Sequence, residues 1–223
     1  MRFITFLLLT LFTGPTIASA INPISLYGER IEFDVVREGE VVGEHITRFQ
    51  QVDDELRVSS NMNIDIFILF LPVYSFDYRT TEKWVEGKLV SLDVNVVDGS
   101  DHLSFKAQRK DAALEIQLKD RIAEINKPVF TTNHWNANVV KDNQVLNTLT
   151  GNLNAVTITP KGEEEIIVSN GSLNAQRYDY SGDLEDTSVW YDEMGRWVKL
   201  RFLASDGSTI EYRCRTCKAG GAQ

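Results

Sequence analysis

Apolar and polar residues alternate along most of the chain after its first twenty residues, which is the pattern of β-strands with one buried face. Along residues 55–66, ELRVSSNMNIDI, five apolar positions share one face of an extended chain: Leu56, Val58, Met62, Ile64 and Ile66. A period of two over this length indicates a strand rather than a helix. The same alternation recurs in residues 31–35, 198–202 and 210–214. We therefore expect a chain built almost entirely of strands.

Short turn sequences separate these alternating segments at regular intervals. Asp98-Gly99, Asn170-Gly171 and Asp206-Gly207 are three of them. Asn-Gly and Asp-Gly pairs favour tight hairpins, because these residues adopt positive φ at low cost. Regular alternation of strand and turn is typical of an antiparallel meander.

These patterns predict the fold class and the domain organisation. We expect one all-β domain over residues 21–213, a large curved antiparallel sheet that forms a half-barrel or β-roll. Convincing helical periodicity is absent, and the best candidate for one short helix or a long loop lies near residues 128–141. A curved sheet of this size commonly encloses a pocket.

The first twenty residues, MRFITFLLLTLFTGPTIASA, have the features of a secretory signal peptide. Arg2 is followed by an apolar stretch, and Ala18-Ser19-Ala20 fits a small-residue cleavage site, so we expect cleavage after Ala20 and a periplasmic or secreted protein. The apolar stretch is too short for a typical spanning helix, although an uncleaved anchor is the alternative. No later segment has the length and composition of a transmembrane helix.

Charge and motifs exclude several classes of function. The chain carries a formal charge of −9, which becomes −10 once Arg2 is removed. Such an acidic protein is repelled by nucleic acid and by anionic membrane surfaces. The sequence holds no metalloprotease, nucleotide-phosphate or dinucleotide motif, so we expect no cofactor. Its three histidines, His45, His102 and His134, lack metal-ligand spacing, so we expect no metal.

Aromatic residues concentrate on one face of the segment YSFDYRTTEKW, residues 74–84. We expect this face to point into the concave side of the sheet, where a carboxylate such as Glu82 needs a partner to offset its burial. The candidate ligand-binding residues are this face together with three aromatic residues from later segments: Tyr74, Phe76, Tyr78, Glu82, Trp84, Trp135, Trp190 and Tyr191.

His45 is a second polar residue expected on the inner face, since it alternates with the polar positions of residues 41–49. A histidine near Glu82 in an apolar pocket could act as a general acid or base, which makes the pair weak catalytic candidates. The alternative is that both side chains only satisfy one another or the backbone.

Two further features have more than one interpretation. The run IFILFLPV, residues 66–73, is apolar at every position, which fits a covered strand end, a pocket mouth, or a patch that meets a membrane or a protein. Cys214 and Cys217 are the two cysteines, in a segment that we expect to be a C-terminal tail, residues 214–223. In an oxidising compartment a local disulfide is expected, with redox activity and metal binding as alternatives.

Several segments together resemble a family of exported bacterial proteins of unknown function, DUF6134, and the broader DUF3108-like group. The matching segments, in order, are REGEVVGEHITRF (37–49), YSFDYRTTEKWVEGKLVSLD (74–93), Trp135-Asn136, LNTLTGNL (146–153), the strand around Tyr178 and VWYDEMGRWVKLRF (189–202). The resemblance implies a periplasmic protein with an open, strongly curved sheet similar to lipoprotein-carrier or VioE-like folds. It implies no reaction.

The sequence thus favours one function class and leaves two others open. We expect a protein that binds an apolar ligand, such as a lipid or acyl chain, on a concave aromatic face. The first alternative is a structural or assembly factor with a protein partner in the cell envelope. The second is an enzyme that uses His45 and Glu82.

Overall fold

The structure is a computed structural model that describes residues 21–169 and 171–217, so the expected signal peptide and the end of the expected tail lie outside the described residues. The first half of the sheet consists of eight strands: β1 (Arg30–Arg37), β2 (Glu40–Val52), β3 (Glu55–Ile68), β4 (Leu71–Val85), β5 (Lys88–Asp98), β6 (Asp101–Lys110), β7 (Ala113–Gln117) and β8 (Ile122–Ile125).

Seven strands form the second half of the sheet, and two short helices accompany them. The strands are β9 (Phe130–Thr131), β10 (Gln144–Leu146), β11 (Leu153–Val168), β12 (Gly171–Gly182), β13 (Ser188–Asp192), β14 (Trp197–Leu203) and β15 (Thr209–Cys214). The helices are α1 (Pro23–Tyr27) and the 3₁₀ helix η1 (Ala137–Lys141).

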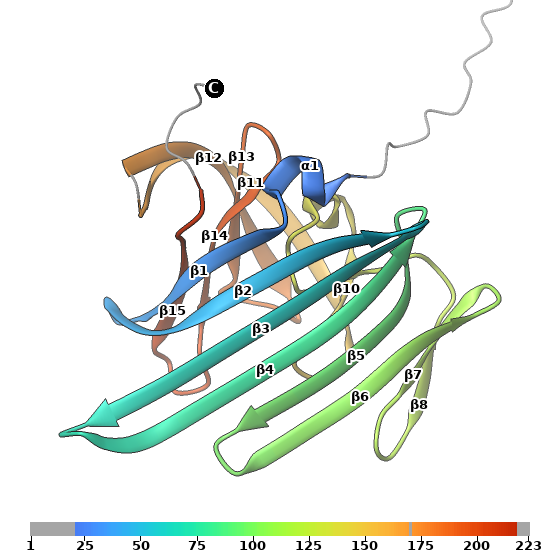
Figure 1. The fold of residues 1–223 in the computed structure, drawn as a ribbon, viewed down its shortest axis with the longest axis horizontal. Coiled ribbons are helices and arrows are strands. Elements are labelled where there is room, and N and C mark those ends of the chain that lie inside the picture. Colours follow the sequence, from blue (N-terminus) through green and yellow to red (C-terminus); the bar gives the residue numbers. More distant parts are fainter. Residues whose placement is uncertain (1–20, 170, 218–223) are drawn as a thin grey trace, which may run out of the picture.

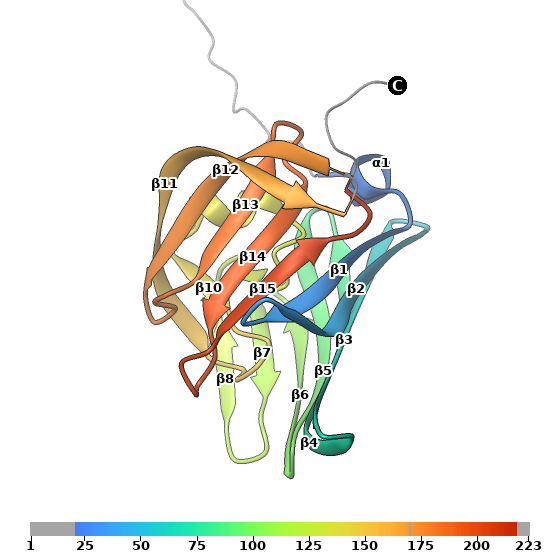
Figure 2. The same cartoon turned by 90° about the vertical axis from the view of Figure 1, so that its left-hand side faces the viewer.

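All of these strands belong to one 15-stranded sheet, whose order runs from β8 through β1, then β15, and on to β9. Every pairing is antiparallel except that of β9 with β10. The sheet curves so strongly that β11–β15 face β1–β6 (Figures 1 and 2). The expected all-β fold with a large curved antiparallel sheet is confirmed, and the expected short helix near residues 128–141 is η1.

The sequence analysis missed α1, which precedes the first strand. Asn22 caps it, because its side chain accepts hydrogen bonds from the backbone N–H groups of Ile24 and Ser25, and Pro23 occupies the first turn, where its missing N–H costs nothing. Gly28 ends the helix at a φ of 77°. In the described part of the chain, no helix has the length and apolarity needed to cross a membrane.

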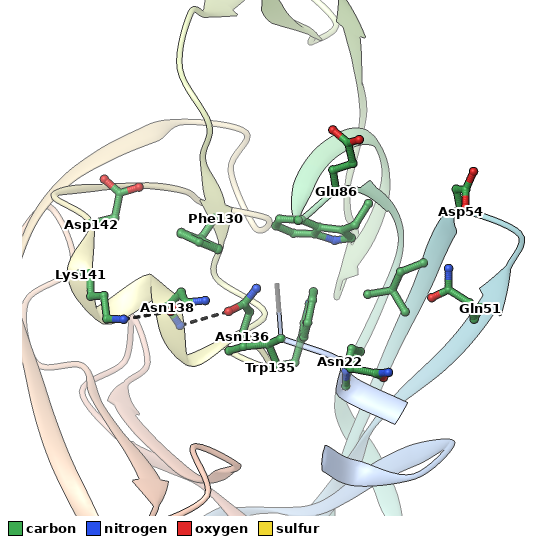
Figure 3. Close-up of a pocket in the computed structure, with 15 residues that line it drawn as sticks. Asn22, Gln51, Asp54, Glu86, Phe130, Trp135, Asn136, Asn138, Lys141 and Asp142 are labelled. Carbon is green, nitrogen blue, oxygen red and sulfur yellow. Dashed lines mark hydrogen bonds between the residues drawn. The ribbon is translucent and has the colours of Figure 1, made fainter. Parts of the chain in front are cut away.

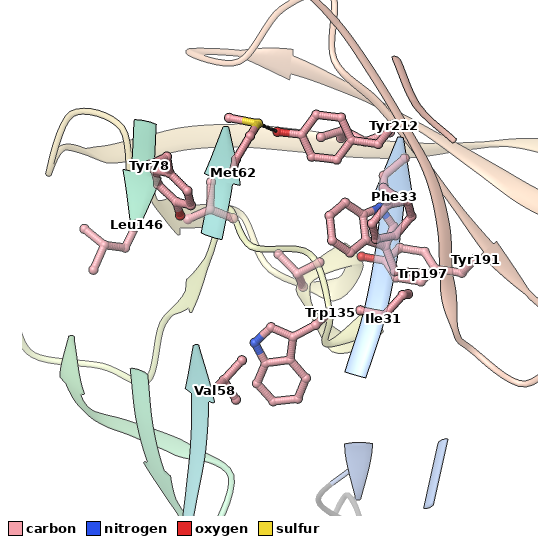
Figure 4. Close-up of a cluster of buried hydrophobic side chains, with 14 of the residues drawn as sticks. Ile31, Phe33, Val58, Met62, Tyr78, Trp135, Leu146, Tyr191, Trp197 and Tyr212 are labelled. Carbon is pink, nitrogen blue, oxygen red and sulfur yellow. Dashed lines mark hydrogen bonds between the residues drawn. The ribbon is translucent and has the colours of Figure 1, made fainter. Parts of the chain in front are cut away.

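The concave side of the sheet is filled by the chain itself. The segment from Val129 to Thr148 runs between the two halves, drawn in yellow in Figure 2. Its buried residues are Val129, Thr131, Asn133, His134, Trp135, Asn136, Val139, Val145, Leu146 and Thr148. Figure 4 shows Trp135 beside Val58 of β3 in this core. The expected open aromatic face is therefore reduced to the spaces that this segment leaves.

The cysteine segment belongs to the folded core, contrary to the expectation of a tail that begins at residue 214. Cys214 ends β15 and forms a disulfide with Cys217, and both side chains are buried. The backbone N–H of Arg215 donates to the carbonyl of Glu32 at 2.8 Å, which continues the contact with β1. Because both cysteine side chains are buried, the segment from Cys214 to Cys217 packs as part of the core. The disulfide itself agrees with the prediction.

Gly43 has a packing role in the β2–β3 pairing, where it lies opposite Ile64. A Cβ at this position would lie 2.0 Å from the backbone oxygen of Asn63, so the two strands would have to separate. We expect Gly43→Ala to lower the free energy of unfolding by about 3 kcal/mol in urea titrations.

A matched control separates this contact from backbone strain. Gly207 has a φ of 81° and open space around its Cα, so Gly207→Ala tests strain alone, with an expected loss of about 1 kcal/mol. Equal losses in the two variants would show that the close approach of β2 and β3 is not the reason for glycine at position 43.

Candidate functional site

Glu82 of β4 is fully buried and accepts four hydrogen bonds. The Thr131 hydroxyl and the Asn133 amide donate to Oε1 at 2.7 and 2.6 Å. The indole N–H groups of Trp84 and Trp135 donate to Oε2 at 2.8 and 3.0 Å. All four partners are donors, which matches the acceptor capacity of two carboxylate oxygens. Glu82 therefore joins β4 to the segment that fills the sheet.

This network fixes two indole rings in one orientation. Trp84 and Trp135 pack edge to face, with centroids 5.4 Å apart, and the ring of Phe130 stacks on Trp84 at 6.1 Å. Because Glu82 takes both indole N–H groups, the two rings have no free polar group to offer to a ligand. They present only carbon atoms at their exposed edges.

A cleft of about 500 Å³ opens beside these rings, and we call it the tryptophan cleft. Its apolar wall comprises Ile21, Pro23, Leu56, Trp84, Phe130 and Trp135. Its polar rim includes Gln51, Asp54, Glu86, Asn138, Lys141 and Asp142. Figure 3 shows the rings of Phe130 and Trp135 beside the space between η1 and the turns that carry Asp54 and Glu86. The cleft thus combines an apolar wall with a charged rim.

A smaller cavity of about 130 Å³ lies deeper between the two halves of the sheet, and we call it the histidine cavity. His45 of β2 and His134 line it together with Met62, Tyr78 and Tyr212. The Tyr212 hydroxyl donates to the sulfur of Met62 at 2.8 Å (Figure 4).

His45 and His134 each make one side-chain hydrogen bond. His45 Nε2 lies 3.1 Å from the Thr47 hydroxyl, and its Nδ1 has no hydrogen-bond partner among the described residues. His134 Nδ1 lies 3.4 Å from the Tyr180 hydroxyl.

Burial keeps the histidine cavity uncharged. It lowers the pKa of His45 to about 3, with a smaller contribution from His134, and it lowers the pKa of His134 to about 4. It also raises the pKa values of Tyr78, Tyr180 and Tyr212 far above the usual tyrosine range. Both imidazoles are therefore neutral at pH 7, which suits a cavity with apolar neighbours.

No hydrogen bond joins the two catalytic candidates, His45 and Glu82, in the described residues. Glu82 is occupied by its four donors, whereas His45 bonds to Thr47. Tyr78 lies between the two groups. Its hydroxyl donates to Asn133, a partner of Glu82, at 2.6 Å, and the centroid of its ring lies 6.4 Å from that of the His45 ring. The two polar groups belong to separate sites, and the structure does not bring them together as an acid–base pair.

The remaining ligand-binding candidates lie in different places. Tyr191 faces inward and its hydroxyl donates to the backbone oxygen of His134 at 2.8 Å. Trp190 faces the other way, since successive strand residues alternate, and its N–H donates to Glu164 at 2.9 Å. The Lys199 ammonium lies over the Trp190 ring at 5.0 Å. Trp190 therefore lies outside both cavities.

Tyr74 and Phe76 stand far from the tryptophan cleft along β4. They lie near the β3–β4 turn, whereas Trp84 lies near the opposite end of the strand. Neither residue lines the tryptophan cleft or the histidine cavity. Of the sequence candidates, the structure brings together Glu82, Trp84 and Trp135.

Sequence reasoning missed the partners that make Glu82 part of a network. Thr131 and Asn133 belong to the run TTNHW, residues 131–135, in which polar residues directly precede Trp135. A buried carboxylate requires donors, and this run is the richest source of them in the irregular part of the chain. Tyr27 was also missed; its hydroxyl donates to the carbonyl of Trp135 at 2.7 Å and accepts from the N–H of Trp197.

Metal binding has no candidate centre in residues 21–169 and 171–217. No group of three or more His, Cys, Asp or Glu side chains there could hold a metal ion.

Comparison with known proteins gives a family and a fold. The domain of unknown function DUF6134 matches residues 33–215, which include Cys214. A crystal structure of a β-barrel-like protein of the domain of unknown function DUF1849 from Brucella abortus is similar in fold, with a TM-score of 0.58 and 9% sequence identity. The similarity covers 86% of this chain and 97% of that one. No curated protein matches the sequence.

Proposed function

The chain belongs to the DUF6134 family, which carries no assigned activity, and we propose from its geometry that it binds an apolar ligand, such as a lipid or acyl chain, in the tryptophan cleft. The observation that carries the proposal is the wall of Trp84, Trp135 and Phe130, in which Glu82 fixes both indoles and Phe130 stacks on Trp84. A rigid apolar wall costs little to organise when a ligand binds, so most of the gain from burying an alkyl chain is retained.

Size favours the tryptophan cleft over the histidine cavity as the ligand site. Pockets for small molecules commonly measure about 300–1,000 Å³, and the cleft, at about 500 Å³, lies within that range. The histidine cavity, at about 130 Å³, holds only a few atoms. An acyl chain therefore fits the cleft, and the cavity is too small to hold more than its end.

The rim determines which head group such a ligand carries. Asp54, Glu86 and Asp142 contribute three carboxylates, of which that of Asp142 pairs with Lys127 at 3.6 Å, and Lys141 contributes one ammonium group. A fatty-acid anion would meet mostly like charge there. The rim therefore favours an uncharged or zwitterionic head group, such as that of a monoacylglycerol.

Filling the cleft from its rim tests the proposal without disturbing the core. Asn138 lines the cleft, and its side-chain oxygen accepts a hydrogen bond from Lys141 at 3.2 Å. We expect Asn138→Trp to weaken binding of a monoacylglycerol by at least about tenfold in calorimetric titration, because the new ring occupies the space of the chain.

Asn174→Trp is the matched control. Asn174 is exposed on β12 and does not line the cleft, so this variant should bind like the wild type. A wild-type protein that binds no monoacylglycerol, or an Asn138→Trp variant that binds as tightly as the control, would refute the proposal.

A further inference from the structure

The β3–β4 hairpin extends beyond the rest of the sheet as a two-stranded ribbon (Figure 1). Ile64 is the last residue of β3 that pairs with β2. Phe76 is the first residue of β4 that pairs with β5. Beyond these positions the strand pairing of β3 and β4 is with each other, and one further backbone hydrogen bond joins the Gly99 N–H to the Ser75 oxygen at 3.0 Å. We call residues 65–75 the hairpin ribbon. At a strand rise of ~3.3 Å per residue it projects roughly 15 Å.

Apolar side chains cover the end of this ribbon. Residues 66–76 carry no charge, and Leu69 and Phe70 at the tip are 86% and 97% exposed. Five exposed apolar residues surround the turn: Phe67, Leu69, Phe70, Leu71 and Val73. Because neighbouring strand positions point to opposite faces, both faces of the ribbon are apolar. An exposed patch of this kind marks a contact surface in a protein that is otherwise acidic.

The turn at the tip is made of residues that its backbone conformation disfavours. Leu69 and Phe70 both have positive φ, 50° and 68°. A two-residue hairpin turn with two positive φ values strongly favours Asn-Gly, because bulky side chains crowd the backbone in this conformation. The turns at Glu38-Gly39 and Glu86-Gly87 do place glycine second. Large apolar residues at the tip therefore oppose folding, which indicates that their side chains are needed for contact outside the chain.

We propose that the hairpin ribbon inserts its tip into the surface layer of a lipid bilayer. A pocket on a protein partner would have to enclose both faces and the end of a protruding ribbon, whereas the acyl region of a bilayer surrounds an inserted tip without any preformed shape. Insertion is shallow, ~5–10 Å, since the backbone groups of the turn keep their contact with water and head groups at that depth.

The charged residues around the base of the ribbon determine which lipid head groups the ribbon can approach. Asp65 and Asp77 bracket the uncharged residues, and the neighbouring turns carry four more acidic residues: Glu38, Glu40, Asp98 and Asp101. The nearby Arg37 and Arg79 are paired with Asp206 and Asp77 at 2.7 and 2.9 Å. This acidic surround repels anionic head groups, so the ribbon is suited to a zwitterionic surface.

Membrane insertion does not rest on the proposed ligand site. Leu56 and Trp84 line the tryptophan cleft near one end of β3 and β4, and the ribbon is the other end of the same strands. Either site can fail its test while the other passes.

The test uses Leu69→Asn/Phe70→Gly, which replaces the tip by the sequence that its turn conformation favours. Residues 21–223 of the wild type and of the variant are sedimented with phosphatidylcholine vesicles. We expect the wild type to bind and the variant to bind at least about tenfold more weakly, because it loses the exposed apolar area of two large side chains. The variant should also unfold at a higher urea concentration, since it relieves the crowded turn.

Two controls complete the experiment. Ile122→Thr/Ile167→Thr removes two exposed apolar side chains on β8 and β11 and should bind vesicles like the wild type. Replacing part of the phosphatidylcholine by phosphatidylglycerol should weaken binding at low salt, with recovery at high salt. A wild type that does not bind phosphatidylcholine vesicles, or a Leu69→Asn/Phe70→Gly variant that binds equally well, would overturn the proposal.

Discussion

Glu82→Leu is expected to lower the free energy of unfolding by on the order of 5 kcal/mol, because it leaves four buried donors without an acceptor. The donors belong to Trp84, Trp135, Thr131 and Asn133, and all four of these residues are buried. Urea unfolding followed by circular dichroism measures the loss. A red shift of tryptophan emission should accompany it as the two indoles gain contact with water.

Two further variants serve as comparisons for Glu82→Leu. Glu82→Gln keeps an acceptor oxygen for both indoles. Its amide nitrogen faces the Thr131 hydroxyl, which can turn to accept, and the Asn133 amide, which loses its acceptor, so its expected cost is about 2 kcal/mol. Glu115→Leu removes a half-buried carboxylate that pairs with the exposed Lys110, with an expected cost of about 1 kcal/mol or less. If Glu82→Leu proves as stable as Glu115→Leu, the network does not anchor the segment that fills the sheet.

Lowering the pH from 7 to 5 is expected to remove roughly 4 kcal/mol of stability through the two buried histidines. In the unfolded chain a histidine has a pKa of about 6.5, whereas burial lowers the pKa of His45 to about 3 and that of His134 to about 4. Between these values the unfolded chain binds more protons than the folded one, so stability falls as the pH falls. The loss begins near pH 6.5, above the range in which ordinary carboxylates titrate.

Urea titrations at several pH values measure this loss, and His45→Gln assigns it. Glutamine can keep the contact with Thr47 and cannot be protonated in this range, so roughly half of the pH dependence should remain, from His134. A wild type whose stability is unchanged between pH 7 and 5 would show that both imidazoles accept protons in the folded state.

Alternation of apolar and polar residues predicted the strands because the sheet has one buried face over most of its length. Val58, Met62 and Ile64 are buried and Asn63 and Asp65 are exposed, as the period of two requires. The disulfide could be predicted from the spacing of Cys214 and Cys217 together with the expected export to an oxidising compartment.

The contents of the concave side could not be predicted from periodicity. Residues 129–148 are mostly irregular, and they reach Glu82 only because the chain returns between the two halves of the sheet. The structure does not bring His45 and Glu82 together, for the same reason: Thr131 and Asn133 from this segment donate to the Glu82 carboxylate in place of His45. Which donor satisfies a buried acceptor depends on tertiary contacts that no local pattern records.

The apolar run at residues 66–73 broke the alternation because those residues leave the sheet. Ile66 still packs against the core, but from Phe67 to Val73 apolar residues are exposed on both faces, so the rule that links burial to every second residue no longer applies there. The apolar composition of this run fits a covered strand end, a pocket mouth, or a patch that meets a membrane or a protein, and the exposed tip favours the last of these over a covered strand end.

Anomalous X-ray diffraction from crystals grown with a monoacylglycerol brominated on its chain tests the central claim most directly. The account predicts bromine density in the tryptophan cleft, beside the edges of Trp84 and Phe130, and no such density in crystals of Asn138→Trp. Bromine density at other sites with an empty cleft, or crystals of the wild type that take up no brominated chain at saturating concentration, would contradict it.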